Sequence, residues 1–99
     1  PYVQRPACPD ILFNSYERPD SAGHGHGFDP AIPEYMEALR STDRDAFALI
    51  TAIEARPTFA AEDWLIIATS DHGGKGTGHG RQNADSRMTF IASNKPIAR

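Results

Sequence analysis

The fold is decided by residues 62–74, which read E-D-W-L-I-I-A-T-S-D-H-G-G. The apolar run at 64–69 is typical of a strand buried on both faces, as in a parallel sheet. A glycine- and histidine-rich loop, residues 70–80, follows it. Loops that leave such strands are where α/β proteins place their chemistry. We therefore expect a buried strand that delivers Asp71 and His72 to a site at the edge of a sheet.

A long helix is predicted before this strand, over residues 34–56. Its apolar side chains recur at intervals that fit one face of a helix with a period of 3.6 residues. They are Tyr35, Leu39, Ala46, Leu49, Ile50 and Ile53. Pro33 suits the first helical turn, and the Arg56-Pro57 pair ends the pattern. A helix between two strands indicates a right-handed crossover in a parallel sheet.

Two further strands are predicted at residues 10–16 and 88–92. The first leads into residues 21–27, S-A-G-H-G-H-G, which we interpret as a loop because so many glycines disfavour a helix interior. Both histidine-rich loops should then leave the same, carboxyl-terminal edge of the sheet. The fold class we expect is α/β, a mostly parallel sheet with flanking helices.

The composition excludes some classes of partner. The chain has 99 residues and a net charge of −3, so no nucleic-acid-binding signature is present. No apolar run approaches the roughly 20 residues of a membrane span. A single cysteine, Cys8, forbids an internal disulfide and leaves the compartment open. The chain begins at Pro1 without a signal-type segment, and its first residues are typical of a linker, so we expect a fragment. Localisation and oligomeric state are left open.

All four histidines of the chain fall in the two glycine-rich loops: His24, His26, His72 and His79. Asp20 precedes the first loop and Asp71 opens the second. A lone histidine in such a loop is usually solvated surface, but this concentration favours a metal site. Imidazole nitrogen and carboxylate oxygen together suit zinc or manganese.

Three motifs resemble the alkaline phosphatase superfamily, and within it the nucleotide pyrophosphatase/phosphodiesterase type. They are D-S-A-G-H at 20–24, T-S-D-H-G-G at 69–74 and H-G at 79–80. The resemblance runs from about Pro9 to the end of the chain. It implies that residues 1–99 are part of an α/β/α sandwich, the carboxyl-terminal part of a metal-binding catalytic domain.

The resemblance also implies a ligand set for two divalent ions, most commonly zinc. Asp20, His24 and His79 would bind the first ion, and Asp71 and His72 would supply part of the second site. The family's nucleophile, a threonine or serine, and a further aspartate are expected upstream of Pro1. His26 has no place in the motif and is expected to support a ligand or face solvent.

The function implied is metal-dependent hydrolysis of phosphate mono- or diesters, with a small-molecule phosphate ester as substrate. Without its nucleophile, the isolated chain should be inactive. One alternative is a non-catalytic metal-binding module; others are a phosphomutase or a sulfatase-like member of the superfamily. Typical sulfatases bind one calcium ion and lack the D-x-x-G-H pair, so Asp20 and His24 argue against that branch. Lys75 could contact a phosphate, but an exposed loop lysine is usually only solvated.

Overall fold

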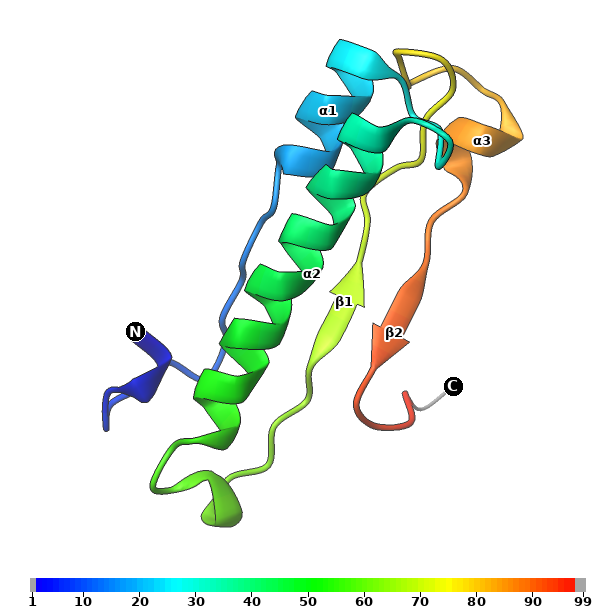
Figure 1. The fold of residues 1–99 in the computed structure, drawn as a ribbon. Coiled ribbons are helices and arrows are strands. Elements are labelled where there is room, and N and C mark those ends of the chain that lie inside the picture. Colours follow the sequence, from blue (N-terminus) through cyan, green and yellow to red (C-terminus); the bar gives the residue numbers. More distant parts are fainter. Residues whose placement is uncertain (1, 98–99) are drawn as a thin grey trace.

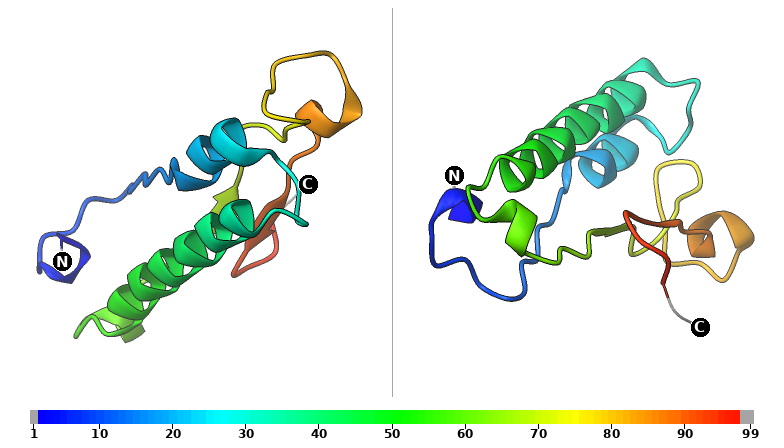
Figure 2. Two further views of the ribbon diagram at one scale, coloured as in Figure 1. Left: turned by 45° about the horizontal axis from the view of Figure 1, so that its top comes forward. Right: turned by 90° about the horizontal axis from the view of Figure 1, so that it is seen from below.

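The computed structural model describes residues 2–97 as a mixed helix and strand fold (Figure 1). Its helices are α1 (Arg18–His26), α2 (Pro33–Glu54) and α3 (Ala84–Arg87), its strands are β1 (Ile67–Thr69) and β2 (Ile91–Ser93), and 3-10 turns cover Tyr2–Gln4 and Phe59–Ala61. Helix α1 packs against α2. The right-hand view of Figure 2, from below, shows these two helices on one side of the molecule and the two strands on the other.

The prediction of helix α2 is confirmed to within two residues at each end, since it begins at Pro33 and ends at Glu54. All six apolar positions of the predicted stripe are partly or fully buried, and Ile53 is the most enclosed of them. The charged residues of the other face are exposed: Glu37, Arg40, Asp43, Arg44 and Glu54. The amphipathic pattern therefore orients this helix, because burying its apolar face is favourable.

The prediction of a loop at residues 21–27 is wrong, because Arg18–His26 form helix α1. Its start follows ordinary helix chemistry: Pro19 stands in the first turn, and Asp20 is an acidic group near the positive end of the helix dipole. The end of α1 is also typical of a helix. Gly27 follows the last helical residue with a φ of 122°, and its N–H donates to the Gly23 carbonyl at 2.8 Å.

Tertiary contact compensates for the glycines inside α1. Each glycine costs roughly 1 kcal/mol relative to alanine in a helix interior, so local propensity alone disfavours this element. The guanidinium of Arg18 donates to Asp45 at 2.5 Å and to Ser41 at 2.7 Å, and both acceptors lie on α2. These contacts with α2 are tertiary and leave no local pattern, so the glycine content alone made the segment resemble a loop.

The strand predictions need correction. Residues 10–16 form no strand; they are an extended link into α1 (Figure 1). The other two strands are shorter than expected, and they pair antiparallel, with Ile67 opposite Ser93. The expected parallel sheet is not seen within residues 2–97, and burial on both faces is wrong for β1, which is exposed throughout. A strand is buried on both faces only where neighbouring strands and helices cover it, and within the described part each strand has one neighbour.

The amino-terminal segment is anchored to the end of α2 by Arg56, a buried residue. Its guanidinium donates to both Glu62 carboxylate oxygens, at 2.8 and 2.6 Å, and to the carbonyls of Val3 and Arg5. The Trp64 indole N–H also donates to Glu62, at 2.6 Å. The guanidinium of Arg56, with hydrogen bonds from Thr58 and Trp64, lowers the pKa of Glu62 to about 2.

Little apolar surface is enclosed in this part of the chain. Among residues 2–97 the buried hydrophobic side chains are Val3 and Ile53. Large apolar side chains remain exposed along the amino-terminal link and around both strands, the most exposed being Phe13 at 93%, Ile11 at 85% and Met88 at 72%. None of the helices described in residues 2–97 has the length and apolarity to cross a membrane.

Candidate metal centre

Helix α1 places Asp20 and His24 on one face, one turn apart. Residues separated by four positions in an α-helix lie above one another, so their side chains meet. Here the Oδ1 atom of Asp20 lies 3.4 Å from Nε2 of His24. The four-residue spacing of Asp and His in the D-x-x-G-H motif is the spacing of one helical turn. Helix α1 therefore holds both side chains in a fixed relative position.

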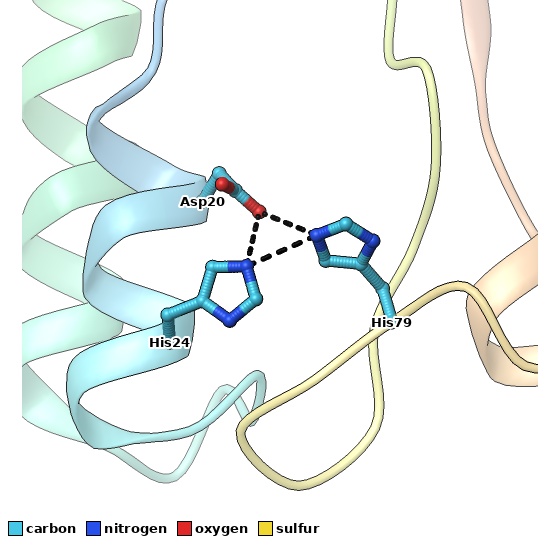
Figure 3. A group of neighbouring side chains, drawn as sticks. All are labelled: Asp20, His24 and His79. Atoms are coloured by element: carbon cyan, nitrogen blue, oxygen red, sulfur yellow. Dashed lines mark hydrogen bonds and ion pairs between the residues drawn. The ribbon is translucent and has the colours of Figure 1, made fainter.

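The glycine-rich loop after β1 brings His79 to this face of α1. Its Nε2 atom lies 3.3 Å from Asp20 Oδ1 and 3.0 Å from Nε2 of His24. The ligand atoms of the three residues all lie within 4.8 Å of one another, and Figure 3 shows them pointing toward a common centre. Two segments far apart in sequence thus converge on one cluster of a carboxylate and two imidazoles.

His72 and Asp71 lie at the side of this cluster. The His72 ring stacks on that of His79 with centroids 3.6 Å apart, and its Nε2 atom is 3.7 Å from Asp20 Oδ1. The Asp71 carboxylate approaches His72 Nε2 at 3.6 Å, while 90% of its side chain is exposed. The structure therefore brings all five candidate ligands into one region, with Asp71 at its edge.

His26 is not part of the cluster. It is exposed at the end of α1, where it lines an open groove of about 440 Å³ together with residues of the loop at 74–77. Lys75, in the same groove, forms an ion pair with Asp85 at 3.2 Å. The position of His26 agrees with the expectation that it faces solvent.

Backbone carbonyls fix the orientation of two imidazoles. Nδ1 of His24 lies 2.9 Å from the carbonyl oxygen of Thr77, and Nδ1 of His72 lies 2.7 Å from that of Gly73. A carbonyl oxygen only accepts, so each Nδ1 carries the proton and donates it. In the neutral ring, Nε2 then presents a lone pair toward Asp20. Sequence reasoning missed both carbonyls, because any residue type can supply one.

The centre of the cluster has the character of a cation site. Oδ1 of Asp20 is buried and has no hydrogen-bond partner within residues 2–97. Imidazole lone pairs and a carboxylate oxygen that face one another repel, unless a ring Nε2 carries a proton that it donates to its neighbour or a cation lies between them. Neutral imidazole nitrogen with one carboxylate is a donor set for borderline divalent ions such as zinc. The residues present therefore fit a divalent metal.

Comparison with protein families gives this cluster its context. Residues 3–90 match the family of type I phosphodiesterases / nucleotide pyrophosphatases. The chain belongs to this family. The match confirms the resemblance argued from the motifs. It also supports a phosphoester hydrolase-like protein. The family is generally metal-dependent and acts on small phosphate esters. No curated protein and no solved structure matched the chain.

Proposed function

We propose that the protein is a metal-dependent hydrolase of phosphate mono- or diesters in which Asp20, His24 and His79 hold one divalent ion. The observation that carries this proposal is the convergence of Asp20 Oδ1 with two Nε2 atoms at 3.3 and 3.4 Å. Helix α1 fixes the first two ligands and the Thr77 carbonyl orients His24, so the ligand atoms are arranged before an ion arrives.

Asp71 and His72 supply part of a second site in this proposal. His72 Nε2 also faces Asp20 Oδ1, at 3.7 Å, which supports an ion placed next to the first. We favour zinc for both sites, with manganese as the alternative, because both accept imidazole and carboxylate ligands. Two such ions, when bound, supply Lewis-acid stabilisation to the attacking and leaving oxygens of a phosphoryl group. The residues of this chain would bind and orient them.

We further propose that residues 1–99 are one part of a larger catalytic domain, a mostly parallel α/β/α sandwich. The exposed apolar side chains support this: Ile67 of β1 is 48% exposed and Ile91 of β2 is 66% exposed. Isolated two-stranded pairs are marginal in water, and additional strands or helices would bury these side chains. The nucleophile would come from that remaining part, so the chain by itself would show no turnover.

Metal binding by the 99-residue chain tests the first proposal directly. Titration with Co²⁺, followed by visible absorption and calorimetry, should show tight binding by the wild type and a large loss of affinity in His24→Ala. The matched control is His26→Ala, which changes an exposed histidine on the same helix and should bind as the wild type does. Equal binding by all three proteins would contradict the assignment.

Turnover separates a hydrolase from a non-catalytic metal-binding module. A longer chain that includes upstream residues should hydrolyse p-nitrophenyl phosphate or bis-p-nitrophenyl phosphate in the presence of Zn²⁺ or Mn²⁺, whereas the 99-residue chain should not. His24→Ala should abolish this activity and His26→Ala should preserve it. Metal binding without turnover in the longer chain would favour the module, and activity that survives His24→Ala would overturn the hydrolase proposal.

A further inference from the structure

Phe28, in the link between α1 and α2, lies against the candidate metal centre. Its ring is half-buried and meets the His24 ring edge to face, with centroids 5.5 Å apart and an interplanar angle of 82°. The His79 ring stands in the same relation, at 6.1 Å and 87°. Edge-to-face aromatic pairs are attractive and directional. One phenylalanine ring therefore contacts a proposed ligand on α1 and another on the loop after β1.

Two glycines make room for this ring. A Cβ atom at Gly23, on α1, would lie 2.3 Å from the Phe28 ring, and a Cβ at Gly74, in the loop, would also lie 2.3 Å from it. Both glycine backbones are thus closer to the ring than any other residue type permits. The Phe28 N–H also donates to the Gly76 carbonyl at 2.8 Å, which ties the backbone of this residue to the same loop.

The Phe28 ring also contacts helix α2. Tyr35 packs against Phe28 edge to face, with ring centroids 5.7 Å apart. Phe28 is therefore in contact with all three segments whose relative placement sets the site: α1, α2 and the loop after β1. The loop is rich in glycine and has little conformational preference of its own, so an external contact must define its position.

We infer that Phe28 is a positioning residue whose ring sets the distance between His24 on α1 and His79 on the loop. This inference rests on the proposed function, since it gives the two histidines their role as ligands. Without the ring, α1 and the loop lose the packing surface that they share. The two Nε2 atoms, now 3.0 Å apart, would then no longer be held for one ion.

The test is Co²⁺ binding by the 99-residue chain in matched phenylalanine variants. We expect Phe28→Ala and Phe28→Leu to weaken binding roughly 10- to 100-fold, the range typical for residues that support metal ligands. The visible spectrum of bound Co²⁺ should also change, since it reports ligand geometry. Phe28→Leu keeps an apolar side chain and should retain the helical circular dichroism. Phe47→Ala removes an exposed phenylalanine from α2 and should match the wild type in both measurements.

A double variant tests the packing itself. Gly23→Ala should weaken Co²⁺ binding because its methyl group meets the Phe28 ring, whereas Gly25→Ala, with open space around it, should not. Gly23→Ala combined with Phe28→Ala should bind no more weakly than Phe28→Ala alone, since the obstructing ring is gone. Additive losses would overturn the inference.

The outcomes distinguish this inference from the proposal on which it rests. Unchanged affinity and spectrum in Phe28→Leu, with binding by the wild type intact, would overturn the role of Phe28 and leave the metal centre standing. Absence of binding by a wild-type chain that shows its helical circular dichroism would overturn both.

Discussion

Asp20 and His79 face each other across two separate segments, with Asp20 Oδ1 3.3 Å from His79 Nε2. The same oxygen lies 3.4 Å from Nε2 of His24 and 3.7 Å from Nε2 of His72. A single carboxylate atom is thus the point on which three imidazoles converge. Its lack of a hydrogen-bond partner within residues 2–97 makes Asp20 the side chain on which cation binding should depend most.

Asp20→Asn is therefore expected to reduce the affinity for Co²⁺ or Zn²⁺ by at least roughly 10- to 100-fold. That range is typical when a group that supports a metal ligand is lost, and the loss of a ligand itself should not be smaller. The amide keeps the shape of the side chain but removes its negative charge. Calorimetric titration measures the effect. Asp43→Asn makes the same change on the exposed face of α2 and serves as control. Affinity that falls equally in both variants would indicate a general charge effect and contradict the assignment.

The ligands could be found from the sequence because their chemistry is in the side chains and their spacing is local. Four histidines in two glycine-rich segments, with Asp20 and Asp71, are enough to indicate a metal site. The sequence did not show that Asp20 and His24 share one helical face, because the glycines of this segment led us to predict a loop in place of α1. The sequence also could not show that the Thr77 carbonyl lies against His24, since every residue type has a backbone carbonyl.

The fold was likewise predictable only in part: the long helix was predicted correctly, but the pairing and extent of the strands were not. Helix α2 carries 22 residues of amphipathic pattern and follows that pattern closely. The length and burial of the strands were overestimated. An apolar run indicates that a segment can be buried, but its burial depends on neighbouring strands and helices, which residues 2–97 do not supply. The contacts of Arg56 with the Val3 and Arg5 carbonyls also join positions about fifty residues apart, beyond the reach of local pattern.

Gly25→Ala tests whether residues 18–26 are helical in solution. The position lies inside α1, and a Cβ there meets nothing within 4 Å. Alanine should stabilise the helix by about 1 kcal/mol over glycine. For a chain of this size the midpoint of thermal unfolding should then rise by about 4–8 °C, measured by circular dichroism. No gain in stability would favour the loop that the glycine content suggested.

Gly73→Ala should have the opposite effect. A Cβ at Gly73 would lie 2.0 Å from the carbonyl oxygen of Asp85 and 2.8 Å from that of Met88, and backbone atoms cannot move aside cheaply. We expect a loss of at least about 1–3 kcal/mol in the free energy of unfolding, the range for overpacked sites. Because the Gly73 carbonyl accepts the proton of His72 Nδ1, metal affinity should fall as well.

The control for Gly73→Ala lies in the same loop. Gly78 has open space around its Cβ position and no positive φ, so Gly78→Ala should leave stability close to that of the wild type. Chemical denaturation of both variants measures the difference. Equal stability of the two would show that the close approach of Gly73 to the Asp85 carbonyl is absent in solution.

Glu62→Gln should remove a pH-dependent contribution to stability. The hydrogen bond from Arg56, with those from Thr58 and Trp64, lowers the pKa of Glu62 from 4.5 to about 2 in the folded chain. A carboxyl with a lowered folded-state pKa stabilises the fold fully above its unfolded pKa. That contribution is lost as the pH falls through the folded value. The wild type should therefore exceed Glu62→Gln in stability above pH 4.5, and the difference should shrink between pH 4.5 and about 2.

Thermal unfolding of both proteins across this pH range measures the effect. Thr58→Ala removes one of the hydrogen bonds to the Glu62 carboxylate, at 2.6 Å, while keeping the Arg56 pair. Its stability loss should be smaller than that of Glu62→Gln but should narrow over the same pH range. A difference between wild type and Glu62→Gln that grows as the pH falls would have the wrong sign. It would show that the carboxylate is not stabilised by Arg56 in the folded chain.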